Sequence, residues 1–204
     1  MLFSRDYNSI SSPTEALYTD KGSRFLSFAY PVMNEKEIKE TLSALKLQYP
    51  DATHHCYAWV LNPDRMAFRA NDDGEPSNTA GRPILKQINA MNLTNILVVV
   101  VRYFGGKKLG VPGLIEAYGN AARLCLDKVN IITKTLLDYF KIVTEFENEH
   151  IIYNIARRFS AEIMETSHAE KVTIVIAING SKTEQLLNYT REMNNFELKF
   201  LKTE

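Results

Sequence analysis

The amino-acid sequence predicts an α+β protein of two modules, and three observations lead to this fold class. The 204 residues are 45% hydrophobic and 24% charged, an ordinary composition for a globular protein. Segments with the period of a strand alternate with segments that have the period of an amphipathic helix. Their succession restarts near Lys134, so we place a boundary between Asn130 and Lys134 and predict domains over residues 1–130 and 134–204.

The front module begins with a strand hairpin and a helix. Residues 15–18 and 24–30 have strand composition and are joined by a short turn that contains glycine. Asn34 precedes a helical pattern of apolar residues, with Glu37 three residues on, the spacing of a capping box. Pro50 ends this helix, because proline cannot continue it.

A second hairpin, two helices and a buried strand complete the front module. We predict strands over residues 54–61 and 66–70, and helices over residues 83–91 and about 113–128. Residues 96–103 are mostly β-branched and apolar on both faces, which predicts a fully buried strand. The predicted order is β-β-α-β-β-α-β-α.

The back module has the element order of a ferredoxin-like unit. The predicted elements are a strand over 134–146, a helix over 148–159, strands over 162–166 and 171–178, a helix ending near 193 and a strand over 196–201. Ser181 and Glu184 have the spacing of a capping box for the second helix. The order β-α-β-β-α-β predicts a ferredoxin-like βαββαβ module.

Composition limits the location and the partners. The apolar run at residues 96–101 is far too short to cross a bilayer, and the N-terminus lacks the apolar segment of a signal peptide. We therefore expect a cytoplasmic protein with no membrane partner. Cys56 and Cys125 lack metal-site spacing, which predicts buried thiols. The 24 basic residues balance the 24 acidic ones, so any basic surface must be local.

A polar loop over residues 71–83 contains three carboxylates with two possible roles. They belong to Asp72, Asp73 and Glu75. In the favoured interpretation they order the loop, by capping the following helix and by pairing with basic residues. The candidate basic residues are Arg69, Arg82 and Arg102. This interpretation assigns the chain no metal and no cofactor.

In the other interpretation, the same carboxylates bind a hard cation such as Mg²⁺ together with a histidine of the neighbouring strand. His54 and His55 are adjacent and point to opposite faces of that strand, so at most one of them faces the loop. We take His54 as the candidate.

A second loop, over residues 104–113, is rich in glycine and leads into a helix. Its glycines let backbone N–H groups approach a ligand, while Arg102, Lys107 and Lys108 add positive charge before a helix N-terminus. This pattern predicts an anion cradle, but the glycines equally suit tight turns, and both interpretations remain open. The candidate phosphate-binding residues are Arg82, Arg102, Gly105, Gly106, Lys107 and Lys108. We expect both loops to reach the same edge of the module and form one site.

Several dense motifs resemble the YigZ/IMPACT family. They are HHCYA at 54–58, DDGEPS at 72–77, TAGRPIL at 79–85 and VRYFGGKKLG at 101–110. The resemblance covers about residues 13–126, and the back module is similar to the small domain that follows in the bacterial two-domain members. It implies a front domain similar to the second domain of ribosomal protein S5, and a back domain similar to the last domain of elongation factor G.

The resemblance implies a cytosolic, translation-associated role with nucleic-acid binding. Eukaryotic relatives regulate translation through a kinase pathway, but they use an additional domain that is absent here, so kinase regulation is not transferred. The sequence departs from the family pattern at Asn78, Pro112 and Glu116. The last two make the second loop stiffer and less positive.

The leading hypothesis is a non-enzymatic protein that binds RNA or a ribosome-associated partner through the DDGEP and RYFGGKKLG loops. One alternative is a metal-assisted hydrolase or phosphoryl-transfer enzyme that uses His54 or His55 with the loop carboxylates. Another is a module for protein interaction only. The sequence does not determine the ligand or the oligomeric state.

Overall fold

Alternating apolar residues assemble the front unit around a five-stranded antiparallel sheet in the computed structural model, which describes residues 5–204. The sequence expectations that concern residues 1–4 lie outside this range. The sheet order is β2-β3-β6-β4-β5. The strands are β2 (Thr14–Asp20), β3 (Ser23–Pro31), β4 (His54–Leu61), β5 (Ala67–Asn71) and β6 (Ile96–Tyr103).

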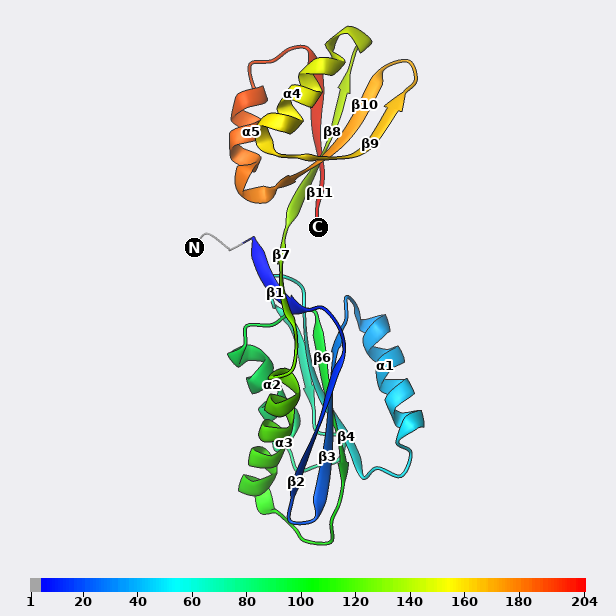
Figure 1. Cartoon of the computed structure of the whole chain (residues 1–204), viewed down its shortest axis with the longest axis vertical. Coiled ribbons are helices and arrows are strands. Elements are labelled where there is room, and N and C mark those ends of the chain that lie inside the picture. Colours follow the sequence, from blue (N-terminus) through cyan, green and yellow to red (C-terminus); the bar gives the residue numbers. More distant parts are fainter. Residues whose placement is uncertain (1–4) are drawn as a thin grey trace. The chain divides into compact units, whose positions relative to one another are not determined.

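Helices cover both faces of this sheet (Figure 1). One face packs against α1 (Glu35–Gln48), and the other packs against α2 (Gly81–Ala90) and α3 (Gly110–Leu126). The central strand β6 therefore places Val98 and Val100 in one core and Val99 and Val101 in the other, as its continuous apolar sequence predicts.

The predicted capping box of α1 is present. The Asn34 carboxamide oxygen accepts a hydrogen bond from the Glu37 N–H at 3.0 Å, and the Glu37 carboxylate accepts from the Met33 N–H at 2.8 Å. Two backbone donors at the helix start are thereby satisfied.

The back unit is an antiparallel four-stranded sheet of order β11-β8-β10-β9, with two helices on one face. Its core is formed by side chains such as Phe140, Ile174, Ile155 and Leu186. The elements are β8 (Leu137–Thr144), α4 (Glu149–Phe159), β9 (Glu162–His168), β10 (Val172–Asn179), α5 (Thr183–Thr190) and β11 (Phe196–Thr203). Short 3₁₀ turns over Phe146–Asn148 and Gly180–Lys182 precede the two helices.

Three details of the sequence prediction are wrong, and the first is that it contains no strand over residues 6–10, which form β1. The predicted strand over 134–146 is two strands, because β7 (Ile131–Thr135) pairs with β1 (Asp6–Ile10) before β8 enters the back sheet. The predicted capping box at Ser181 does not form. Ser181 lies in the 3₁₀ turn, and both its N–H and its hydroxyl donate to the Asn179 side chain.

The chain divides by its contacts into two compact units, with the division between Lys134 and Thr135. Each unit has a hydrophobic core of its own. Both units mix helices with antiparallel sheets, so the chain is an α+β protein.

We predict that residues 134–204 fold without the front unit, because the core of the back unit uses only side chains from within that range. The isolated fragment should give a cooperative thermal transition by circular dichroism. A fragment without a cooperative transition would show that the boundary is misplaced.

Candidate functional site

The loop between β5 and α2 closes on itself. A Cβ atom on Gly81 would lie 2.4 Å from the backbone nitrogen of Asn71, so the two ends of the loop are in contact and only glycine fits there. The Asp72 carboxylate accepts hydrogen bonds from the N–H groups of Asn78, Ala80 and Gly81 at 2.8–2.9 Å. Asp72 thus caps the N-terminus of α2, where Ala80 offers no side-chain cap.

Asp73 ties the loop to β4 and α1. One of its carboxylate oxygens accepts from the His55 N–H at 2.7 Å, and the other lies 3.5 Å from the Lys46 ammonium. Its carbonyl oxygen lies 2.7 Å from Nδ1 of His54. Asp73 and Asn78 have positive φ angles of 40° and 62°, a conformation that aspartate and asparagine tolerate better than most residues. This explains how asparagine occupies position 78.

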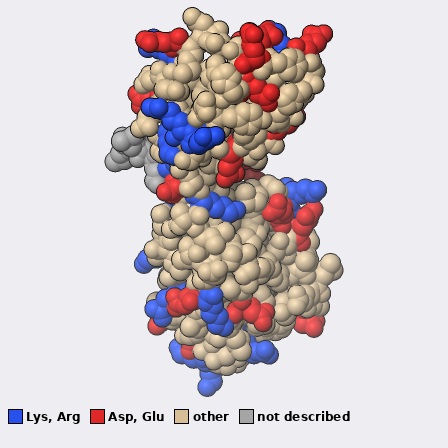
Figure 2. Space-filling view, turned by 45° about the horizontal axis from the view of Figure 1, so that its top comes forward, with Lys and Arg blue, Asp and Glu red and all other residues tan. Residues whose placement is uncertain are grey.

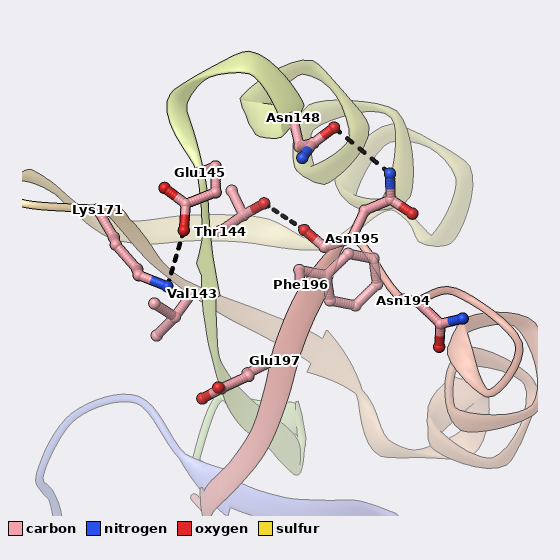
Figure 3. Close-up of a pocket in the computed structure, with 9 residues that line it drawn as sticks. All are labelled: Val143, Thr144, Glu145, Asn148, Lys171, Asn194, Asn195, Phe196 and Glu197. Atoms are coloured by element: carbon pink, nitrogen blue, oxygen red, sulfur yellow. Dashed lines mark hydrogen bonds and ion pairs between the residues drawn. The ribbon is translucent and has the colours of Figure 1, made fainter.

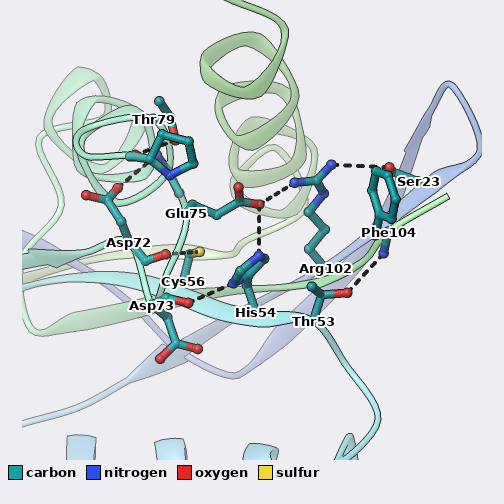
Figure 4. Close-up of polar contacts among 12 residues, drawn as sticks. Ser23, Thr53, His54, Cys56, Asp72, Asp73, Glu75, Thr79, Arg102 and Phe104 are labelled. Atoms are coloured by element: carbon teal, nitrogen blue, oxygen red, sulfur yellow. Dashed lines mark hydrogen bonds and ion pairs between the residues drawn. The ribbon is translucent and has the colours of Figure 1, made fainter. Parts of the chain in front are cut away.

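Glu75 points inward and forms a buried ion pair with Arg102 (Figure 4). Both side chains are less than a tenth exposed. The same Glu75 oxygen accepts from the Tyr118 hydroxyl at 2.8 Å and lies 3.8 Å from Nε2 of His54. The Arg102 guanidinium also donates to the Ser23 hydroxyl. Side chains from β3, β4 and α3 therefore contact this buried pair.

Burial favours the neutral forms of the neighbouring titratable groups. Burial raises the pKa of the Cys56 thiol and of the Tyr118 hydroxyl, which contact each other at 3.3 Å. A protonated thiol is a poor nucleophile, so Cys56 has a packing role here. Burial also lowers the pKa of His55, which favours its neutral form.

In the second loop, Gly105 packs directly on the β2–β3 turn. A Cβ atom at this position would lie 1.9 Å from the carbonyl carbon of Gly22. The Gly105 N–H donates to the Ser23 hydroxyl at 3.2 Å, and the Phe104 N–H donates to Thr53 at 3.2 Å. The glycine at 105 is thus required for close backbone approach, whereas Gly106 has positive φ and open space around it.

A pocket of about 360 Å³ lies between the two loops and the start of α3. Its lining residues are Glu75, Pro76, Arg102, Phe104, Lys108, Leu109, Gly110, Val111 and Leu114. The first turn of α3 contains no acidic residue, and Leu109 supplies no side-chain cap. The backbone donors of this helix start are therefore not occupied by a side-chain cap, unlike those of α2.

The structure brings together some of the predicted site residues. Glu75, Arg102 and Lys108 line the pocket, and His54 approaches it through Glu75. The other predicted residues lie outside the lining. Asp72 and Asp73 order the loop, Arg82 is exposed at the start of α2, and Gly105, Gly106 and Lys107 lie beside the pocket.

This site also contains Tyr118, Ser23 and Phe104, which the sequence did not single out as site residues. Tyr118 gave a usable signal, because a tyrosine on the apolar face of a helix needs a partner for its hydroxyl. Ser23 gave none, because its role depends on Arg102, which is 79 residues away.

The metal hypothesis gains no support from the described residues. Within residues 5–204, no three His, Cys, Asp or Glu side chains are grouped so that they could bind a metal ion. The carboxylates of Asp72, Asp73 and Glu75 each have separate protein partners.

A second hollow belongs entirely to the back unit (Figure 3). It lies at the ends of β8 and β11, where the Lys171 ammonium is paired with Glu145 at 2.8 Å. None of the predicted site residues lines it. On the face shown in Figure 2, basic and acidic side chains are intermixed, in agreement with the zero net charge.

These features define a two-unit α+β protein. In its front unit, the first polar loop is held by hydrogen bonds and an ion pair within the unit, and a pocket lies beside the second loop. The model of the Impact N-terminal domain matches residues 21–126, more than half of the chain. The chain therefore belongs to the IMPACT family.

Relatives of similar length exist in bacteria. The IMPACT family member YvyE of Bacillus subtilis is 32% identical over 173 residues, which are 85% of this chain and 80% of that protein. The IMPACT family member YigZ of Escherichia coli is 28% identical over 196 residues, which are 95% of this chain and 96% of that protein.

One crystal structure of a hypothetical protein aligns with 97% of this chain and 98% of its own, at 27% identity and a TM-score of 0.71. The two-unit fold is thus shared with a protein of similar length. In the described part of the chain, no helix has the length and apolar character needed to span a membrane.

We predict that Asp72→Ala and Asp73→Ala each destabilise the front unit, by about 1–3 kcal/mol, because partly buried N–H groups lose their acceptor. Asp72→Ala should cost more, since Asp72 accepts from three N–H groups and Asp73 from one. Urea unfolding followed by fluorescence of Trp59, the single tryptophan, measures the front unit alone. The exposed Ser77→Ala is the control, and equal midpoints for all variants would refute this account of the loop.

We predict that Gly105→Ala destabilises the front unit, because its Cβ would overlap the backbone at Gly22. Gly119→Ala is the matched control. Gly119 lies inside α3, and a Cβ there would meet only the end of the Gln87 side chain at 3.7 Å, so alanine should be neutral or stabilising by about 0.5–1 kcal/mol. Thermal melting by Trp59 fluorescence compares the two. A Gly105→Ala protein that melts like the wild type would mean that the hairpin does not rest on this loop.

Proposed function

We propose that this protein binds RNA in a translation-associated role, through the face of the front unit formed by the DDGEP and RYFGGKKLG loops. One observation supports the proposal most strongly: the exposed Lys108 lines a pocket together with the uncapped start of α3, whereas Arg102 in the same lining is already paired with Glu75. The partial positive charge of a helix N-terminus and its backbone donors favour a phosphate.

The local charge agrees with an anionic ligand although the chain is neutral overall. Lys107 and Lys108 are exposed and precede α3, whose first turn contains no acidic residue. The start of α2 is unsuitable, because the Asp72 carboxylate already accepts from its N–H groups. Arg82, exposed at that helix start, is then a peripheral phosphate contact at most.

Two residues weaken the phosphate site in this member of the family. Pro112 lies in the first turn of α3 and has no N–H to donate. Glu116 is exposed further along the same helix and adds a negative charge. We therefore expect moderate affinity that depends strongly on salt.

The folds that we propose for the two units agree with a translation-associated role. We propose that the back unit is ferredoxin-like and similar to the last domain of elongation factor G, since its strand order β11-β8-β10-β9 and element order β-α-β-β-α-β are those of that fold. We also propose that the front unit is similar to the second domain of ribosomal protein S5, and that the protein is cytoplasmic. The resemblance to the IMPACT family implies the same translation-associated context.

A ribosome-associated protein is a second candidate partner. Phe104, Val111 and Ile115 are 48%, 53% and 44% exposed beside the pocket, and such a group of apolar side chains suits a protein contact.

We predict that Lys107→Ala with Lys108→Ala weakens RNA binding across many sequences and lowers its salt dependence by roughly one to two counterions. Glu116→Arg should tighten binding, more at low salt than at high salt, because screening reduces the added attraction. Filter binding at two salt concentrations measures both effects.

The fold should be unaffected, since all three side chains are exposed, and melting of each variant checks this. Identical affinities for the wild type and both variants would exclude the second loop as a phosphate site and favour the protein partner.

A further inference from the structure

The pocket beside α3 has features that a phosphate alone does not require. Its volume of about 360 Å³ is at the lower end of the range for pockets that bind small molecules. Much of its wall is apolar, from Pro76, Leu109, Val111 and Leu114. A phosphate needs donors and positive charge, so this apolar part of the wall must contact another part of the ligand.

We infer that the pocket accepts one unstacked nucleobase of single-stranded RNA, with the adjoining phosphate near Lys108 and the start of α3. This inference rests on the proposed RNA binding and specifies which part of the RNA the pocket takes.

Phe104 supplies an aromatic surface for the base. The residue is 48% exposed although it lines the pocket, and the Arg102 guanidinium lies 5.6 Å from the centroid of its ring. Aromatic rings and guanidinium planes are the surfaces on which proteins stack single-stranded bases, and stacking is tolerant of sequence because every base has a π face.

The polar groups of the pocket suit the edge of a base better than an apolar peptide side chain. Nε of the buried Arg102 has no hydrogen-bond partner among the described residues. All the hydrogen bonds and ion pairs described for the Glu75 carboxylate go to Oε1, which leaves Oε2 available as an acceptor (Figure 4). An apolar occupant would cover the free Glu75 oxygen and would leave the already buried Arg102 nitrogen without a partner, which is unfavourable.

The lysine at the rim orients the nucleotide. Lys108 lines the pocket and Lys107 is exposed next to it, beside the uncapped start of α3. A base in the apolar part therefore has its phosphate near the positive end. A base within a duplex is stacked and paired and does not reach such a pocket, so the inference requires an unpaired strand.

Binding of a single-stranded RNA 10-mer, and of the same 10-mer with abasic residues, tests this inference on the full chain. Phe104→Ala should weaken binding of the ordinary 10-mer about 5- to 100-fold, the range found for loss of one stacked base. It should leave the salt dependence unchanged, because no charge is removed. The abasic 10-mer should bind the wild type weakly and should be insensitive to Phe104→Ala.

Two further variants make the test specific. Phe68→Ala is the matched control, because Phe68 is 60% exposed on the edge strand β5 and does not line the pocket. Val111→Glu should also weaken binding of the ordinary 10-mer. It adds a carboxylate at the pocket rim, and an acidic residue in the first turn favours the helix, so folding is retained even if Phe104→Ala is unstable.

Each remaining outcome has a definite meaning. The wild type could bind the ordinary and the abasic 10-mer equally strongly, with Phe104→Ala changing neither affinity. This result would overturn the inference about the base and leave the proposed RNA binding intact. Equal affinity for mononucleotides and the 10-mer, with none for ribose 5-phosphate, would overturn the assignment to RNA in favour of a free nucleotide. No RNA binding, with Phe104-dependent retention of a protein from cell extract, would overturn both proposals in favour of a protein-docking pocket.

Discussion

The buried ion pair between Glu75 and Arg102 is the interaction on which the front unit depends. Removing two charges from water is costly, and the cost is offset only when both charges are fully paired. Here Tyr118 donates to the Glu75 carboxylate, Ser23 accepts from the Arg102 guanidinium, and that guanidinium lies over the Phe25 ring at 5.4 Å. The pair therefore joins the DDGEP loop to the central strand, to α3 and to the first hairpin, and loss of either charge would leave the other unpaired.

The two loops have different structural roles. The three carboxylates of the first loop already have partners within the protein. Asp72 caps α2, Asp73 accepts from the N–H at the start of β4, and Glu75 pairs with Arg102. In the second loop, Gly105 packs against the first hairpin, whereas Lys107, Lys108 and the start of α3 are exposed. A protein of zero net charge thereby presents exposed lysines beside a partly apolar pocket.

Much of the fold followed from local signals. Residues 54–61 and 96–103 form strands with the predicted bounds, because β-branched and aromatic residues fill half-buried and fully buried sheet positions. The capping box at Asn34 formed as predicted. The failure at 134–146 arose from a tertiary contact, since pairing with β1 makes residues 131–135 a separate strand. At Ser181 the competing contact is local, because the Asn179 side chain two residues earlier accepts from the Ser181 N–H.

For the site, the sequence alone determined which segments matter, because polar loops rich in glycine and proline are conspicuous between apolar elements. It did not determine which carboxylate binds which partner. Glu75 meets Arg102 across 27 residues and Tyr118 across 43, and such pairings exist only when β5, β6 and α3 pack together. The tertiary structure also decided that Phe104 lines a pocket while Arg82 does not, because exposure and direction depend on the packed neighbours and not on residue type.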